Sequence, residues 1–522
     1  MADKYRQQRY SGVLLHPTSL PGNTGIGDIG VPAFKFVDFL HESLQTIWQI
    51  LPLGPVGYGN SPYQSYSAFA GNSLLISLDN LAELGLLTQW EIDSLPKPDN
   101  PHRIDFDYVK LEKGILLKKA MNNFMDKADK SLQKEYRKFQ SENKWWLDDY
   151  SLFMALLDEY DFALWSDWPE EFRDRKPEAL ENYTSRQSKK IERFRIEQFF
   201  FFRQWKALKD YANEKGIRIL GDIPIFVAEN SADVWVNPDE YFLDEKGKPT
   251  VIAGVPPDYF SKNGQRWGNP LYRWSTMRMK HYNWWIKRLK MSLEIVDLIR
   301  IDHFRGFAAY WEVPAKEKTA KNGRWIKGPG KHFFNAVEKK LGHLPLVAED
   351  LGVITKSVVE LRDEYCLPGM KVMHFAFGDT AHNPYLPHNH RLNSVIYSGT
   401  HDNDTTIGWY KQTDAKTKDH VRRYFSCSDD QAPYMILRAV WQSPAKYAIV
   451  PMQDVLHKDS WARLNTPGTD KNNWVWRFEW EELSSHYAES LSYHTALFGR
   501  IPEKITDKID DNTPDPEKAI EL

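Results

Sequence analysis

Residues 297–307 read Asp-Leu-Ile-Arg-Ile-Asp-His-Phe-Arg-Gly-Phe, a short apolar run that ends in charged residues. The run Asp297–Ile301 has the length and composition of a buried β-strand, and Asp302 follows it directly. Seven more runs of this kind, each ending in polar or glycine-containing residues, occur at Gly12–Leu15, Ile47–Leu53, Ile217–Ile225, Leu346–Ala348, Met370–Phe375, Ser394–Ser398 and Ala448–Pro451.

Segments with helical spacing of apolar residues lie between most of these runs. They are Ala33–Leu44, Met277–Leu293, His332–Leu341, Ser357–Tyr365 and Ala432–Gln442. Strands that alternate with helices indicate a parallel sheet, and eight such strands favour closure into a barrel over an open sheet. The sequence therefore predicts an α/β fold, a (β/α)8 or TIM barrel.

The spacing of the predicted strands is uneven, which predicts insertions into the barrel. A length of 522 residues alone would fit several domains, but one elaborated barrel also reaches this size. We expect a single catalytic barrel over residues 1–506 with large, mainly helical insertions after strands 2 and 3, at about 54–216 and 235–273. Residues 507–522 form a polar tail.

Charge and hydropathy exclude several classes of partner. The net charge is −3, from 68 basic and 71 acidic residues, and no basic block stands out. Nucleic acid and anionic membrane are therefore not expected as partners, and no apolar stretch reaches the ~18 residues of a membrane span. Two cysteines and the absence of a visible signal peptide predict a cytoplasmic location. A plastid stroma stays open, because a mature plastid enzyme would have lost its transit peptide.

The chain is rich in large aromatic residues, with 20 tryptophans and 25 tyrosines. Flat rings cover the C–H faces of sugars, but they also pack in large cores. This composition favours a carbohydrate ligand without deciding the question.

Acidic residues lie at or just after the ends of four of the predicted strands, at Asp222, Asp302, Glu349 and Asp402. Barrel enzymes build their active sites where strands end, so these groups should share one rim. A single Asp there could cap a helix, whereas four point to metal binding or glycoside cleavage. Arg300 lies two residues before Asp302 and faces the same way, which keeps Asp302 ionised and disfavours a cation. Glycoside chemistry is the better interpretation.

Longer motifs carry a resemblance over nearly the whole chain. They are Leu15–Pro21, Gly57–Ser65, Gly254–Phe260, Gln265–Pro270, Pro451–Asp454 and Asn465–Gly468, together with the strand-end motifs. In these motifs the sequence resembles amylomaltases (disproportionating enzymes), the 4-α-glucanotransferases of the α-amylase clan.

The resemblance implies a retaining double displacement that moves α-1,4-glucan segments between maltooligosaccharides or chains of starch or glycogen. It makes Asp302 the nucleophile, which forms a covalent β-glucosyl intermediate, and Glu349 the general acid and base. Asp402 is the third carboxylate, which holds sugar hydroxyls. By the same resemblance, further substrate-binding residues are Arg300, His401, Asp222, Tyr63, Trp267, Ser65 and Asp404.

Tyr63, Trp267 and the loop Gly254–Gln265 are expected to favour a sugar acceptor over water, with the loop as a lid across the cleft. No phosphate-binding glycine loop and no Cys/His metal spacing is present, so we expect neither a cofactor nor a metal ion. Three alternatives stay open: an α-glucan hydrolase on the same barrel, a non-catalytic glucan-binding protein and a metal-dependent hydrolase. The sequence makes no prediction about oligomeric state.

Overall fold

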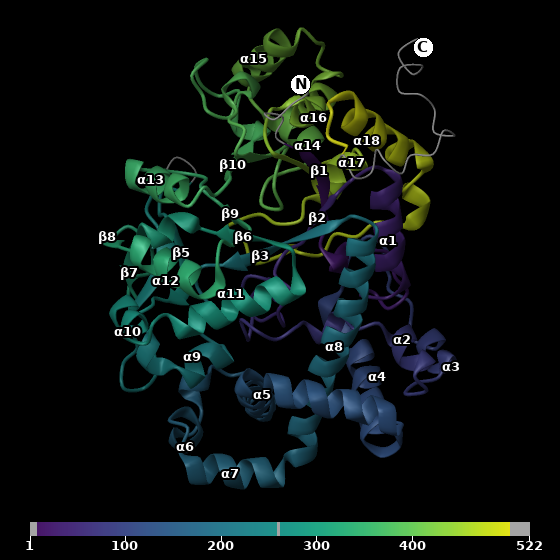
Figure 1. Ribbon diagram of the computed structural model, residues 1–522, viewed down its shortest axis with the longest axis vertical. Coiled ribbons are helices and arrows are strands. Elements are labelled where there is room, and N and C mark those ends of the chain that lie inside the picture. Colours follow the sequence, from purple (N-terminus) through teal and green to yellow (C-terminus); the bar gives the residue numbers. More distant parts are fainter. Residues whose placement is uncertain (1–7, 258–260, 502–522) are drawn as a thin grey trace.

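The computed structural model describes residues 8–257 and 261–501. At its centre, eight parallel strands close into a barrel (Figure 1). In order around the barrel they are β1 (Tyr10–Leu14), β2 (Ile47–Gln49), β3 (Arg218–Pro224), β6 (Leu298–Asp302), β9 (Leu346–Ala348), β10 (Gly369–Val372), β11 (Ser394–Tyr397) and β12 (Tyr447–Pro451), which pairs with β1. Each strand overlaps one of the eight predicted runs, so the predicted (β/α)8 barrel is confirmed.

The helices around the barrel explain why its strands are largely buried and rich in apolar residues. They include α1 (Val31–Glu42), α8 (Ser188–Glu214), α11 (Asn283–Ile295), α12 (Lys331–Leu341), α13 (Lys356–Glu364), α16 (Ala432–Gln442) and α18 (Ser485–Leu497). Because helices cover the outer face and side chains fill the interior, every residue of β11 and β12 is buried.

One predicted helix is divided. The segment Met277–Leu293 forms α10 (Trp274–Met279) and α11, and the two are separated at His281 and Tyr282. Both residues have left-handed φ angles, 55° and 54°, which end one helix and start the next. The helical period continues across this break, so spacing alone did not reveal it.

The first insertion is helical, as predicted. Its principal helices are α4 (Phe106–Lys127), α5 (Lys130–Glu159) and α7 (Pro177–Arg186), with the shorter α2 (Leu78–Glu83), α3 (Gln89–Asp93) and α6 (Glu170–Arg173). Figure 1 shows α4, α5 and α7 below the barrel, where α5 packs against α8. Aromatic contacts join these helices, among them Phe124 with Tyr136 and Phe200.

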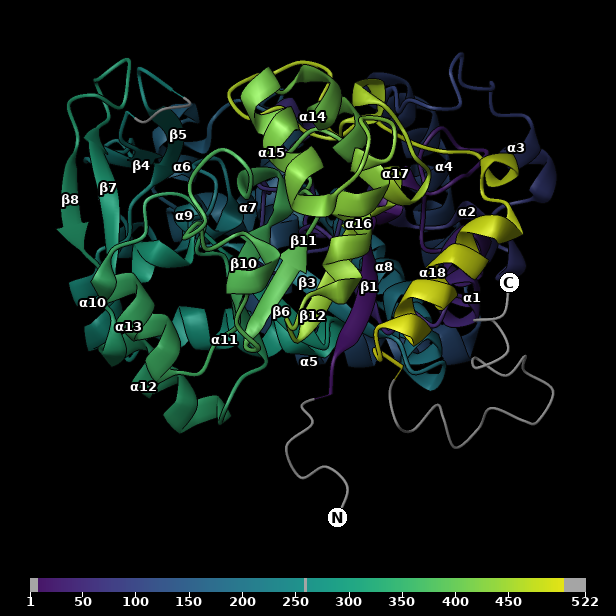
Figure 2. The ribbon, with the colours of Figure 1, turned by 90° about the horizontal axis from the view of Figure 1, so that it is seen from above.

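The prediction that the second insertion is mainly helical was wrong. Besides the short helix α9 (Ala232–Val236), it contributes β4 (Val251–Val255) and β5 (Gln265–Pro270). These pair antiparallel in the order β5-β4-β7-β8 with β7 (Ala309–Pro314) and β8 (Arg324–Lys327), and this sheet stands at one edge of the molecule (Figure 2). The strands pair with a segment that follows β6, and such distant pairing is not visible in local spacing.

Two sequence-based expectations concern residues outside these described ranges. The tail 507–522 and residues 258–260 of the Gly254–Gln265 loop lie outside them. Within residues 8–257 and 261–501, no helix is long and apolar enough to cross a membrane.

Candidate active site

Arg300 on β6 links two of the predicted acidic residues. Residues two apart on a strand face the same way, and the guanidinium Nη2 of Arg300 lies 2.9 Å from Oδ1 of Asp302. β3 places Asp222 directly opposite Arg300, and the two form a buried ion pair. Their exposed fractions are 4% and 3%. The predicted orientation of Arg300 toward Asp302 is therefore confirmed.

Glu349 follows β9, the strand beside β6. The segments that follow β6 and β9 continue side by side beyond the strands, because the N–H of Phe304 donates to the carbonyl of Glu349 over 3.1 Å. The carboxylate of Glu349 accepts from the N–H of His303 at 2.7 Å and of Leu351 at 2.9 Å. His303 has a left-handed φ of 53°. The residue after Asp302 therefore holds the Glu349 carboxylate.

The surroundings of Glu349 raise the pKa of its carboxyl to about 7. Burial is the main cause and the negative charge of Asp302 adds to it, while Arg300 and the two N–H donors act in the opposite direction. Burial also raises the pKa of Asp222, to about 6, against the effect of Arg300. A carboxyl that is partly protonated at neutral pH can donate a proton to a leaving group.

Tyr63 connects the two sides of the site. Its hydroxyl donates to Oδ2 of Asp222 over 2.8 Å and lies 2.9 Å from Nε2 of His401. The rings of Tyr63 and His401 stack with centroids 5.3 Å apart. Nε2 of His401 also lies 3.4 Å from Oδ1 of Asp402, so the Asp222 and Asp402 sides of the rim are joined through these two rings.

Sequence reasoning missed the contacts that three residues in the last part of the chain make with the site. Asn465 Nδ2 donates to Oδ1 of Asp402 over 2.6 Å, and Arg463 Nη2 donates to the Asp402 carbonyl over 2.7 Å. The ring of Trp474 packs against Tyr63 and His401. Asn465 belongs to a motif that supported the resemblance, but nothing local to that motif indicates a contact with Asp402.

The other predicted binding residues fall into two groups. Trp267, on β5, packs edge-on against the ring of His303 with centroids 4.7 Å apart, so it lies beside the Asp302–Glu349 pair. Asp404 instead accepts from Ser460 at 2.6 Å and Gln412 at 3.1 Å. Ser65 donates to the carbonyl of Ser67 at 2.9 Å. The contacts of Asp404 and Ser65 hold loops.

The pKa of Glu349 predicts the alkaline side of the pH profile. If this group is the general acid, kcat/KM should fall as pH rises through about 7, because the raised pKa keeps the group protonated only below that value. The measurement is kcat/KM for maltotriose between pH 5 and 9.

Glu197 on α8 provides a matched control, because burial raises its pKa to about 7 as well. Glu197→Gln should leave the alkaline limb in place. If the alkaline limb disappears in Glu197→Gln, the titration belongs to Glu197 and its assignment to Glu349 is wrong.

The described residues contain no group of three or more His, Cys, Asp or Glu side chains arranged to hold a metal ion. Among the acidic residues of the candidate active site, the positive charge between Asp222 and Asp302 is the guanidinium of Arg300.

Fold and site together define a class of protein, the (β/α)8-barrel enzymes that act on glycosidic bonds with carboxylates at the ends of their strands. Within that class, the chain belongs to the 4-alpha-glucanotransferase family, whose sequence model matches residues 15–483. The resemblance seen in the sequence is thereby confirmed, and so is the expectation of a glucan-transferring enzyme.

Individual relatives agree over almost the full length. The chain is 48% identical to a 4-alpha-glucanotransferase of Synechocystis sp., covering 94% of this chain and 98% of that protein. It is 45% identical to a chloroplastic/amyloplastic 4-alpha-glucanotransferase of Arabidopsis thaliana, covering 95% and 86%. Among solved structures, the amylomaltase of Streptococcus agalactiae in complex with acarbose superposes with a TM-score of 0.92 at 38% identity, covering 94% of this chain and 100% of that chain.

Proposed function

We propose that the protein transfers segments of α-1,4-glucan between maltooligosaccharides, or between chains of starch or glycogen, through a covalent β-glucosyl intermediate on Asp302. The observation that carries the proposal is the hydrogen bond from the N–H of His303 to Glu349, since it ties a carboxyl of raised pKa to the residue after Asp302. Retaining mechanisms need two carboxyls about 5–5.5 Å apart, and the ends of adjacent strands can provide that separation.

In the first step a carboxylate oxygen of Asp302 attacks the anomeric carbon of the donor. The glycosidic C–O bond breaks, and the departing oxygen takes the proton of Glu349. In the second step Glu349 removes the proton from an acceptor hydroxyl, whose oxygen attacks the anomeric carbon and releases Asp302. Arg300 supports the first step because its ion pair holds the Asp302 carboxylate in place.

Asp402, His401 and Tyr63 would bind the sugar at the cleavage site. The Asp402 carboxylate has a fixed contact with Asn465, yet 43% of its side chain is exposed and free to accept from sugar hydroxyls. Buried Asp222 instead keeps Arg300 and Tyr63 in place. We assign Asp222 a positioning role, and we assign loop-holding roles to Ser65 and Asp404.

A hydrolase on the same barrel would use the same three carboxylates, so the choice of acceptor separates the two activities. Trp267 lies against His303, beside the proposed nucleophile and acid. An aromatic ring at this place favours a sugar acceptor, because it covers the apolar face of the sugar and excludes water.

With maltotriose as the only substrate, we expect glucose and a ladder of longer α-1,4-glucans. Each turnover breaks one α-1,4 bond and makes another, so the number of reducing ends should stay nearly constant. Chromatography of the products and a reducing-end assay on the same samples make the measurement. A steady rise in reducing ends without chains longer than the substrate would show a hydrolase.

Trp267→Ala should raise the hydrolytic fraction of turnovers, because it removes the proposed acceptor contact and leaves the three carboxylates unchanged. Trp90→Ala is the matched control, since Trp90 is 75% exposed on α3 in the first insertion. An unchanged ratio of transfer to hydrolysis in Trp267→Ala would remove Trp267 from the acceptor site.

A further inference from the structure

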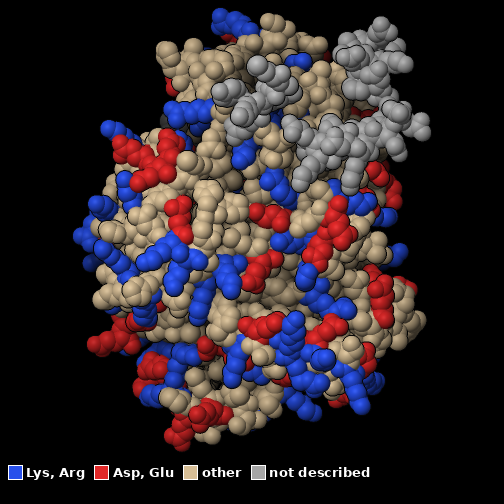
Figure 3. Space-filling model, viewed as in Figure 1, with Lys and Arg blue, Asp and Glu red and all other residues tan. Residues whose placement is uncertain are grey.

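A buried carboxylate that no step of the proposed mechanism uses lies directly after β12. Asp454 belongs to the short helix α17 (Met452–Val455), and only 3% of its surface is exposed. Acidic side chains at the surface lie among Lys and Arg, as one face of the molecule shows (Figure 3). Within residues 8–257 and 261–501, no Lys, Arg or His side chain forms an ion pair with Asp454, so hydrogen bonds must compensate its burial.

Three hydrogen bonds to Asp454 join the two ends of the loop that carries Asp402. Its Oδ2 accepts from the hydroxyl of Ser398 at 2.6 Å and from the hydroxyl of Thr406 at 2.7 Å. Its Oδ1 accepts from the N–H of Thr406 at 2.7 Å. Ser398 follows β11, and Thr406 begins α14 (Thr406–Gln412), so the loop between them starts and ends on one carboxylate.

His374, which follows β10, holds the same arrangement from the other side. Its Nε2 lies 3.0 Å from the hydroxyl of Thr406, whose hydrogen is donated to Asp454. Nε2 of His374 is therefore the protonated nitrogen of this ring. The ring stacks on Trp409 of α14 with centroids 4.8 Å apart, and a Cβ at Gly399 would lie 2.7 Å from its Cε1. A larger residue at position 399 would displace the ring or the loop.

The middle of loop 398–406 reaches the candidate active site with His401 and Asp402. Hydrogen bonds within the loop connect its ends to this part. The side-chain carbonyl of Asn403 accepts from the N–H and the hydroxyl of Thr400, at 2.8 and 2.9 Å. The N–H of Asp402 donates to the same hydroxyl at 3.3 Å. A displacement of the loop ends is therefore transmitted to Asp402.

We infer that Asp454 is a positioning residue for Asp402, because it holds both ends of loop 398–406 and so fixes where the Asp402 carboxylate lies at the rim of the barrel. The inference rests on the role proposed for Asp402 in binding the sugar at the cleavage site. Asp454 is too deeply buried to touch the sugar and acts through the loop. A carboxylate suits this place because it accepts from all three donors, whereas an amide would turn an NH2 group toward some of them.

Single-turnover rates of glucan transfer on maltotriose test the inference. Asp454→Asn should lower the rate by about 10- to 100-fold, since a misplacement of about 1 Å can cost about 10²-fold. In an Asp402→Asn background the same change should cost less than about threefold, because the group that Asp454 positions is already lost. A purely structural effect would be equal in both backgrounds. Thermal unfolding shows whether each variant is folded.

Ser398→Ala is a milder second variant, since it removes one of the three hydrogen bonds without adding volume. It should lower the rate by a smaller factor than Asp454→Asn and show the same dependence on Asp402. If Asp454→Asn does not fold, Ser398→Ala decides the question by the same comparison of backgrounds.

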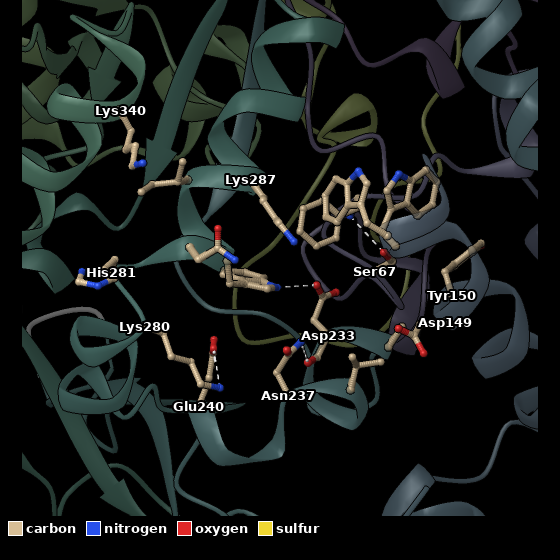
Figure 4. Close-up of a pocket in the computed structure, with 18 of the residues that line it drawn as sticks. Ser67, Asp149, Tyr150, Asp233, Asn237, Glu240, Lys280, His281, Lys287 and Lys340 are labelled. Carbon is tan, nitrogen blue, oxygen red and sulfur yellow. Dashed lines mark hydrogen bonds and ion pairs between the residues drawn. The ribbon is translucent and has the colours of Figure 1, made fainter. Parts of the chain in front are cut away.

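Asp233→Asn is the matched control. Asp233 is also buried, and its donors are also neutral: Nε1 of Trp284 at 3.1 Å and the N–H of Ala68 at 2.7 Å. It lines a cavity between α5, α9 and α11, and no residue of loop 398–406 lines this cavity (Figure 4). The effect of Asp233→Asn on the rate should be the same with and without Asp402→Asn.

Two outcomes overturn the inference and leave the role of Asp402 intact. One is a loss of less than about threefold for Asp454→Asn in the otherwise unchanged protein, and the other is an equal loss in both backgrounds. A full rate in Asp402→Asn alone would instead contradict the role proposed for Asp402, and the positioning role of Asp454 would fail with it.

Discussion

Asp302→Asn is expected to lower kcat for glucan transfer by about five orders of magnitude, as for an enzyme that loses its nucleophile. An amide has the shape of the carboxylate and can still accept from Arg300, so the fold should be retained. It cannot form the glucosyl ester, however. The measurement combines kcat on maltotriose with mass spectrometry of acid-quenched protein, in which the wild type should carry a glucosyl adduct and the variant should not.

Asp404→Asn is the control for this experiment. Asp404 lies two residues from Asp402, but its carboxylate is bound to Ser460 and Gln412. Its loss should cost less than about tenfold in kcat, since it stabilises a loop and makes no contact with reacting atoms. If Asp302→Asn stays within tenfold of the wild type, another group is the nucleophile.

Glu349→Gln is expected to lower kcat on maltotriose by about three to four orders of magnitude, since general acid catalysis supplies up to about 10⁴-fold. The glutamine carbonyl can still accept from His303 or from Leu351 but not from both, so the variant loses the proton and one of these two hydrogen bonds. With an α-maltosyl fluoride donor, whose leaving group needs no proton, the glycosylation rate should largely return. The comparison requires single-turnover rates on both donors.

A rate of Glu349→Gln that returns on the fluoride donor but not on maltotriose identifies Glu349 as the general acid. An equal, complete loss on maltotriose and on the fluoride would mean that the side chain is needed for folding or substrate binding. The alkaline limb near pH 7 should also be absent from the glycosylation rate of Glu349→Gln on the fluoride. A limb that persists there belongs to another group.

Arg300 illustrates how one residue supports both sides of the proposed chemistry. Its charge opposes the burial that raises the pKa of Glu349 and Asp222, and it pairs with Asp302 directly. A buried cation between two carboxylates is costly to leave unpaired, so the contacts of Asp222 and Asp302 also stabilise Arg300. This arrangement places the proposed nucleophile, paired with a cation, beside a carboxyl whose pKa is raised to about 7.

The helical break at His281 and the antiparallel sheet are the two places where local sequence patterns did not predict the structure. A helical period continued through His281 and Tyr282, whereas their left-handed backbone divides the segment into α10 and α11. β4 and β5 pair with β7, which lies beyond β6 in the chain. The partner of a strand is a non-local property, and short strands without their partner resemble loops.

The sequence by itself determined the barrel and the carboxylates at its rim. Both depend on local rules: a period of two places Arg300 and Asp302 on one face, and parallel strands bring their ends to one rim. Only the tertiary structure decided which groups hold those carboxylates, namely His303 on Glu349, Tyr63 on Asp222 and Asn465 on Asp402. The physical reason is that these contacts form across the closed barrel, between residues as many as 159 positions apart, where spacing along the chain carries no information about distance.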